Sequence, residues 1–120
     1  MAKLSANGHE VARYFDPTRG VLVSIRSNGK RLYRGVGTPC WRLLAAKKDD
    51  VSLEQWIDSK LRYMNALPRW CSQVKSLPSL ATLQEWQTDS VCETVTGDRV
   101  EPDGHGPDGA PSWLVALRMI

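Results

Sequence analysis

Three side chains suited to binding anions or bases alternate along two neighbouring runs of the sequence. Arg26 ends the run VLVSIR, and Arg31 and Tyr33 lie in the run KRLYR. In a β-hairpin that turns at Asn28-Gly29, we expect all three to project from one face. Guanidinium groups suit phosphates and carboxylates, and a tyrosine ring stacks on a base. The pattern therefore predicts a basic binding surface, although Arg and Tyr also suit an ordinary solvated strand.

Three further residues extend this predicted surface. Lys30 adds charge at the tip of the turn, and Arg34 follows on the second strand. Trp41 comes soon after the strand ends, near the expected edge of the sheet. Exposed Trp and Arg are the residues that most often anchor protein interfaces. The predicted partner-binding or nucleic-acid-binding residues are Arg26, Lys30, Arg31, Tyr33, Arg34 and Trp41.

Catalytic and metal-binding patterns are sparse. The chain has no G-x-S-x-G, no glycine-rich phosphate loop followed by Lys, and no H-E-x-x-H. His105 lies between Asp103 and Asp108, where a hard cation would find carboxylates, but a polar surface loop accounts for the same residues. Ser112 with His105 and Asp103 makes a catalytic triad only on paper, because one flexible loop does not provide the rigid geometry of acyl transfer. We expect no enzyme activity, no cofactor and no metal.

The Asn28-Gly29 pair predicts the register of the hairpin. Both residues tolerate positive φ and therefore favour a two-residue type I′ turn, which pairs Arg26 with Arg31 and Ile25 with Leu32. Paired residues share a face, and faces alternate along each strand. The expected core face is Val21, Val23, Ile25, Leu32 and Val36 with Arg34 among them, and the expected basic face is Leu22, Ser24, Arg26, Arg31, Tyr33 and Gly35.

The N-terminal half predicts a basic antiparallel sheet over residues 9–46, after a loose leader over 1–8. A first strand at 9–15 and a turn at 16–20 complete a three-stranded meander. The apolar run at 40–46 is either a fourth edge strand or a helical turn. Ser52 and Gln55 have capping-box spacing and open an amphipathic helix, whose stripe of Leu53, Trp56, Ile57, Leu61 and Met64 packs on the sheet while Asp58, Lys60 and Arg62 fall off it.

The C-terminal half predicts smaller elements. Further short helices at 69–77 and 80–87 complete a helical segment over 52–87. A small hairpin turns across Thr96-Gly97-Asp98, a loop rich in Gly and Pro follows at 102–111, and Ser112 caps a final helix. The whole chain is expected to be one α+β domain over 1–120, with 90–120 as its hairpin, loop and terminal helix.

Composition narrows the class of protein. At 120 residues and 42% apolar content, the chain is long enough for one core without disulfides. Its three cysteines are widely spaced, which indicates neither a disulfide framework nor a zinc site. No run approaches the ~18 apolar residues of a membrane span, and the N-terminus lacks the apolar core of a secretory signal. We expect a cytoplasmic protein that does not enter a membrane.

The net charge of +3 conceals an asymmetry between the two halves. Residues 1–48 contain ten basic and two acidic residues, so their balance is +8. Residues 49–120 contain six basic and eleven acidic residues, so their balance is −5. This division indicates an anionic partner for the N-terminal half, unless the two halves face and neutralise each other in the fold.

The C-terminal stretch V-E-P-D-G at 100–104, followed by P-S-W-L at 111–114, resembles a tail in small uncharacterised proteins of phages and mobile elements. Those relatives place Cys and His in this loop, where the present chain has Gly106, Asp108 and Ala110. The resemblance implies a phage-type origin, and proteins of that class commonly bind host machinery. We therefore expect a non-enzymatic inhibitor of the anti-CRISPR or another anti-defence type, whose partner is a host protein or ribonucleoprotein complex. The alternative is direct binding of DNA or RNA by the same basic sheet face.

Overall fold

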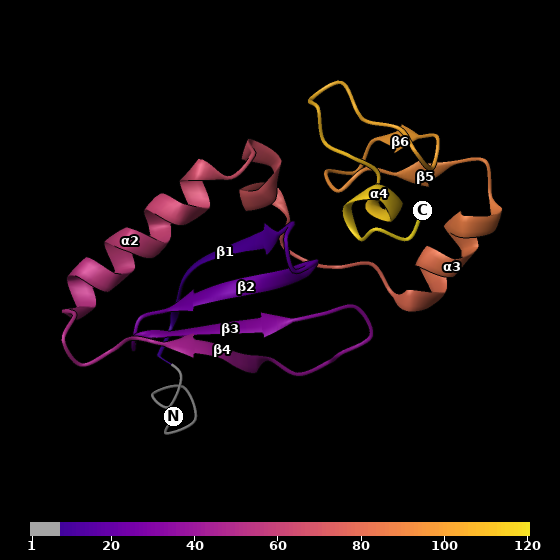
Figure 1. The fold of residues 1–120 in the computed structure, drawn as a ribbon. Coiled ribbons are helices and arrows are strands. Elements are labelled where there is room, and N and C mark those ends of the chain that lie inside the picture. Colours follow the sequence, from indigo (N-terminus) through magenta and orange to yellow (C-terminus); the bar gives the residue numbers. More distant parts are fainter. Residues whose placement is uncertain (1–7) are drawn as a thin grey trace.

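An antiparallel sheet of four strands carries one long helix on one face (Figure 1). The computed structural model describes residues 8–120, so the predicted leader lies almost wholly outside the described residues. The predicted α+β meander is confirmed, and the run at 40–46 supplies its fourth strand rather than a helical turn. In their spatial order the strands are β1 (Glu10–Asp16), β2 (Val21–Arg26), β3 (Lys30–Arg34) and β4 (Arg42–Ala46).

The turn between β1 and β2 is built around a buried aspartate. The Asp16 carboxylate accepts the backbone N–H of Thr18 at 2.9 Å and the Arg19 guanidinium at 2.8 Å. Gly20 has φ 69°, a left-handed conformation that glycine adopts without strain, and it donates its N–H to the Asp16 carbonyl. The Asp16 side chain is fully buried, and these partners satisfy its charge.

The register of the second hairpin differs from the prediction by one residue. Ile25 pairs with Arg31 and Ser24 pairs with Leu32. Gly29 alone takes a positive φ, 87°, and its N–H donates to the Arg26 carbonyl, so the loop holds three residues instead of two. The Asn28 side chain accepts the Lys30 N–H at 3.3 Å, a local bond that favours this longer loop.

This one-residue difference moves every side chain of β3 to the opposite face of the sheet. Arg31 and Tyr33 share a face with the buried Val23 and Ile25, whereas Leu32 lies on the other face. The expected grouping of Leu32 with the core side of β2 is therefore wrong. The expected basic face is also wrong, because Arg31 and Tyr33 do not share a face with Arg26.

Helix α2 (Leu53–Ala66) covers the face that contains Val23 and Ile25 (Figure 1). The Ser52 hydroxyl accepts the Gln55 N–H at 3.1 Å, which confirms the predicted cap. Trp56 is buried against the sheet, and Ile57, Leu61 and Met64 pack around it. The predicted stripe is slightly misplaced, because Leu53 is exposed while Lys60 is partly buried.

The segment after α2 begins with a short 3-10 helix, η1 (Arg69–Gln73), and then runs extended to Ser79. The predicted helix at 69–77 is therefore too long. Val74 has extended φ and ψ and is buried, and the residue before Pro78 disfavours helical geometry. Helix α3 (Leu80–Thr88) follows as predicted, and the Ser79 hydroxyl accepts the Thr82 N–H at its start.

The remaining elements are short. The predicted small hairpin is present as β5 (Cys92–Glu93) paired with β6 (Arg99–Val100). The final helix is α4 (Trp113–Ala116), and the Ser112 hydroxyl accepts the Val115 N–H at its start as predicted. None of the helices in residues 8–120 is long and apolar enough to cross a membrane.

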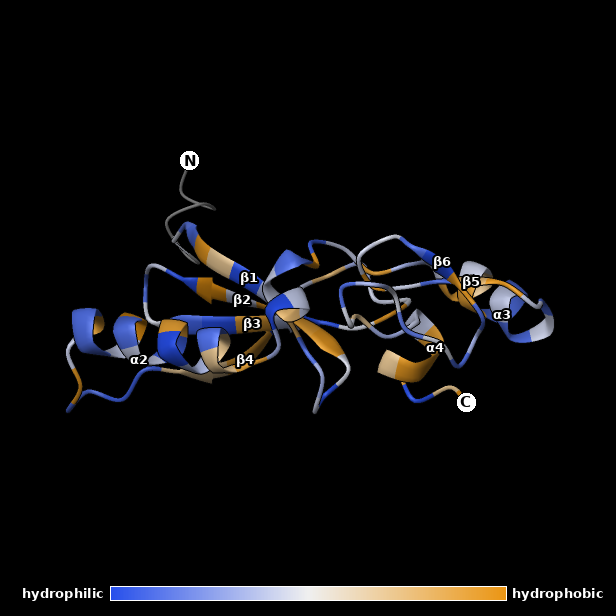
Figure 2. Ribbon diagram, turned by 90° about the horizontal axis from the view of Figure 1, so that it is seen from above, coloured by the Kyte–Doolittle hydropathy of each residue, from blue (hydrophilic) through white to orange (hydrophobic). Residues whose placement is uncertain are grey.

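Two apolar clusters lie on opposite faces of the sheet. Tyr14 and Val23 pack under α2, whereas their strand neighbours Phe15 and Leu22 pack with Trp113 of α4 and the rest of the C-terminal unit, defined here as residues 80–120. Figure 2 shows α2 at one end of the molecule and α3, β5, β6 and α4 at the other. The molecule is elongated, at 50 × 28 × 20 Å. Its radius of gyration of 15.8 Å exceeds the ~13.6 Å of a compact chain of this length.

Ile25→Asp tests the core under α2. Ile25 is completely buried, so the substitution places an unpaired carboxylate between the sheet and the helix and should cost at least ~3 kcal/mol of unfolding free energy. Leu43→Asp is the control, because Leu43 is 58% exposed on the opposite face of the same sheet. Urea denaturation followed by circular dichroism should show a large loss for Ile25→Asp alone. Equal midpoints for the two variants would contradict this packing.

Candidate binding surface

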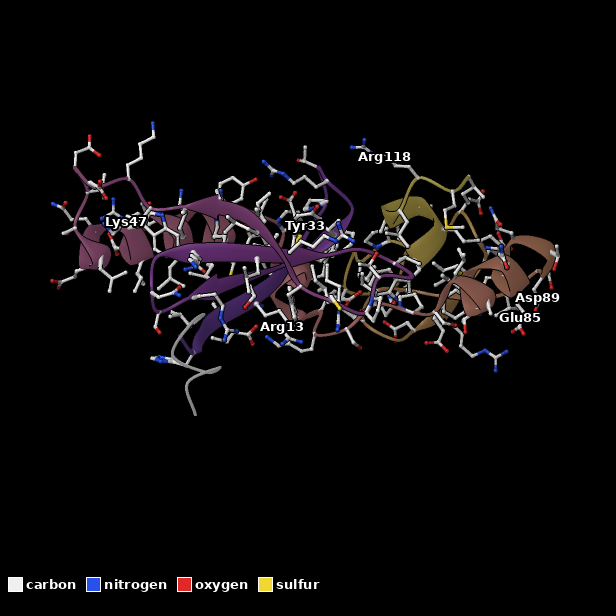
Figure 3. The ribbon with its side chains drawn as sticks, turned by 90° about the horizontal axis from the view of Figure 1, so that it is seen from below. Arg13, Tyr33, Lys47, Glu85, Asp89 and Arg118 are labelled. Carbon is white, nitrogen blue, oxygen red and sulfur yellow. The ribbon has the colours of Figure 1, made fainter. Side chains whose placement is uncertain are left out.

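The sheet face opposite α2 carries several basic side chains. Strand pairing places Glu10 beside Arg26, and Arg13 beside Ser24. Figure 3, seen from below, shows the sheet in front of α2. One end of this face is covered by the C-terminal unit through Phe15 and Leu22. We call the remainder the open face; its side chains are Glu10, Arg13, Ser24, Arg26, Lys30, Leu32, Arg34 and Leu43.

The register divides the predicted binding residues between the two faces. Arg26, Lys30 and Arg34 belong to the open face, and Trp41 lies against it through its ring contact with Arg34. Arg31 and Tyr33 project towards α2 instead, because each pairs with a β2 residue of the core under that helix. The structure therefore brings four of the six predicted residues together.

Arg31 is committed to packing beneath α2. It lies near Tyr14, whose pKa is raised by burial despite the opposing effect of the Arg31 guanidinium. Burial also lowers the pKa of Lys60, and the neighbouring Arg31 charge lowers it further. The Nε atom of Arg31 is buried and has no hydrogen-bond partner among the described residues. This environment makes Arg31 a poor contact for a large partner.

Arg13 completes the open face and was not among the predicted binding residues. Its guanidinium carbon and that of Arg34 each lie 5.1 Å from the centre of the Trp41 ring. Such cation–π contacts hold a guanidinium flat on the indole while its N–H edge stays able to donate. We call these three residues the Arg13–Trp41–Arg34 stack. The alternation of Arg13 and Phe15 with Ala12 and Tyr14 in the sequence was the signal that could have revealed it.

A single carboxylate organises the rest of the open face. The Oε2 atom of Glu10 accepts the Ser24 hydroxyl at 2.6 Å and the Arg13 Nε at 2.9 Å, with the Arg26 Nη1 at 3.9 Å. Partial burial raises the pKa of Glu10, but the Ser24 and Arg13 hydrogen bonds and the two positive charges outweigh it, so the net pKa lies below 4.5. The open face has one acidic side chain, Glu10, and four basic side chains: Arg13, Arg26, Lys30 and Arg34. Its net charge is therefore +3.

The positive charge of the sheet is not neutralised by the acidic half of the chain. The ion pairs between described residues all lie within residues 10–62. Figure 3 shows Glu85 and Asp89 at the opposite end of the molecule from Lys47. Ion pairing between the two halves, the alternative left by the sequence, is therefore absent among the described residues. The side chains of Arg13 and Arg26 are nevertheless only 28% and 18% exposed.

The other predicted chemical groups have structural roles. The Ser112 side chain is buried, donates to the Pro102 carbonyl and caps α4, so it is not an available nucleophile. The loop at 102–111 is held by hydrogen bonds, including one from Thr96 to Asp108 at 2.8 Å, and is not the flexible segment expected. Burial raises the pKa of the Cys71 thiol to about 11, which makes it unreactive. Within residues 8–120, no group of three or more His, Cys, Asp or Glu side chains is placed to hold a metal.

A scan against protein-family models and searches of curated proteins and of solved structures found no match to this chain. The class of protein must therefore be inferred from the open face and its chemistry.

Glu10→Gln tests the carboxylate of the open face through the pH dependence of stability. Because folding lowers the Glu10 pKa, the ionised group stabilises the fold above pH ~4.5, and this contribution is lost as pH falls through the lowered pKa. The contribution is about 1 kcal/mol or less, since the side chain is 30% exposed. Between pH 7 and pH 3, the urea midpoint of Glu10→Gln should therefore fall less than that of the wild type. Glu54→Gln, on the exposed side of α2, should behave like the wild type; an unchanged pH dependence in Glu10→Gln would contradict the network.

Proposed function

We propose that this protein is a non-enzymatic accessory protein of a phage or mobile element that binds host machinery and inhibits it. Its partner is a host protein or ribonucleoprotein complex in the cytosol, as for anti-CRISPR and other anti-defence proteins. The observation that carries the proposal is the open face, where Arg26, Lys30, Arg34 and Trp41 lie together without neutralisation by the acidic half. The C-terminal resemblance supports the phage-type origin.

The composition of the open face favours a macromolecular interface. A Trp ring flanked by guanidinium groups supplies the two residue types most enriched among the dominant contacts of interfaces. Leu43 adds an exposed apolar side chain at the edge strand. Positive charge on such a surface also accelerates encounter with an anionic partner. An inhibitor would use this surface to cover a site on its target that normally meets another molecule.

Affinity capture from a lysate of a bacterial host tests this proposal. The wild-type bait should retain a defined protein or ribonucleoprotein, and Lys30→Glu/Arg34→Glu should lose it, because two positive charges become negative and the net charge of the open face falls by four units. Arg62→Glu/Arg69→Glu changes the net charge equally on exposed residues outside that face and should retain the partner. Capture that is equal for both double variants, or absent for the wild type, would contradict the proposal.

Direct binding of DNA or RNA is the second candidate function. The Arg13–Trp41–Arg34 stack favours it, because the Arg34 guanidinium rests on the ring and can donate to a phosphate, and an aromatic ring interacts with bases. Arg13 contributes charge rather than free donors, since its Nε and Nη1 already donate to Glu10 and to the Lys75 carbonyl. The same surface charge that would attract an acidic protein also attracts a phosphate backbone. Salt dependence separates this candidate from an apolar protein interface, because each neutralised phosphate releases counterions.

A mobility-shift titration tests nucleic-acid binding. Duplex DNA, single-stranded DNA and RNA are compared at 50 and 200 mM salt. If three phosphates contact the open face, affinity should fall by about tenfold or more between these concentrations. Arg34→Ala should weaken binding of every ligand and reduce the salt dependence, whereas Arg62→Ala on α2 should leave both unchanged. No shift at 50 mM salt would exclude this function and leave the open face to a protein partner.

A further inference from the structure

A cleft opens beside the Arg13–Trp41–Arg34 stack, where the sheet meets the C-terminal unit. Its volume is about 460 Å³, within the range of small-ligand sites. One wall is the loop that leaves β3, and the other is the extended segment before α3. The side chains that define it are Arg34, Val36, Pro39, Leu77, Pro78 and Ser79.

The walls of this cleft are suited to a flat, weakly polar group. Val36, Pro39, Leu77 and Pro78 contribute apolar surface from two segments that are far apart in the sequence. Gly37, in the same loop, has φ 75° and nothing within 4 Å of the position where a Cβ would lie. No side chain at Gly37 therefore narrows the cleft on the side of this loop.

The mouth of the cleft is suited to an anion. Arg34 lines the cleft and also rests on Trp41, with no hydrogen bond from its guanidinium to another described residue. Its N–H edge is thus oriented by the stack and still has its donors. Lys30 lies four residues away along β3 on the same face, about 13 Å at the rise of a strand. Helix α3 begins directly after Ser79, and its N-terminal partial charge adds to this positive field.

We infer that this cleft binds a nucleotide unit, with the base between the Pro39 and Pro78 walls and the phosphate on Arg34. The inference rests on the second proposed function, nucleic-acid binding, and specifies it. A single strand can deliver an unpaired base into the cleft and lay its neighbouring phosphates towards Lys30. A duplex cannot, because its bases are stacked and paired. Single-stranded DNA or RNA is therefore the favoured source of this nucleotide, with little sequence preference.

The experiment separates the base from the phosphates. Fluorescence anisotropy at 50 mM salt compares labelled dT10 with a ten-unit abasic strand that carries the same phosphates. The wild type should bind dT10 about tenfold more tightly than the abasic strand, because one held base contributes roughly this factor. Pro39→Glu places a carboxylate at the exposed rim of the cleft and should abolish that preference. Pro107→Glu, on an equally exposed proline of the C-terminal loop, should preserve it.

The outcomes distinguish this inference from the function on which it rests. Equal affinity for dT10 and the abasic strand would overturn the cleft as a base site while nucleic-acid binding stands. Absence of binding to dT10, to duplex DNA and to RNA at 50 mM salt would overturn both. If free dTMP nevertheless binds and Pro39→Glu abolishes its binding, the same nucleotide site is supported with a free nucleotide as its source. Binding of a poly-glutamate peptide, with no binding of either strand, would overturn the inference that the cleft binds a nucleotide. It would indicate an acidic protein as the partner.

Discussion

The left-handed conformation of Gly29 is the constraint on which the surface of this protein depends. With φ at 87° in a three-residue loop, Gly29 sets the pairing of β2 with β3 and hence decides which side chains of β3 face α2. A side chain at this position would be strained by the backbone, and its Cβ would lie 3.1 Å from the Cβ of Lys47. The three-residue loop thereby places Arg31 on the face under α2 and Arg34 on the opposite face.

The two faces of the sheet have different physical roles as a result. The face under α2 is closed by Trp56 and holds one core, at the cost of enclosing the Arg31 charge near Lys60. The opposite face has two parts. The end beside the C-terminal unit belongs to a second core, and the remainder is the open face. Because Phe15 and Leu22 enter that second core, the C-terminal unit is anchored at one end of the sheet and does not extend over the rest of that face. The elongated shape follows from this end-to-end arrangement.

Charge separation is the second consequence of that arrangement. Acidic residues concentrate in the C-terminal unit and basic residues in the sheet, and ion pairs between described residues do not bridge them. The energy of holding four cations on one face is reduced locally, by Glu10 and by the Trp41 ring. These neighbours orient the guanidinium groups without removing their charge, so the face stays suited to an anionic partner.

The sequence by itself determined those features that depend on local chemistry. Ser52, Ser79 and Ser112 each cap the helix predicted to follow them, because a hydroxyl satisfies a free N–H of the first turn wherever that turn lies. Turn residues likewise marked the meander and the small hairpin. Residue type alone singled out Arg26, Lys30, Arg34 and Trp41, whereas the predicted register had placed Arg34 on the core face.

Tertiary structure decided what depends on a difference of one residue or on contacts between distant segments. Asn28-Gly29 is compatible with a two-residue or a three-residue loop, and only the folded sheet shows the three-residue loop, which inverts β3. The stack of Arg13 on Trp41 and the cleft between Pro39 and Pro78 join segments about 30 to 40 residues apart. No local pattern encodes such contacts, because they form only when both apolar clusters have packed on the two faces of the sheet.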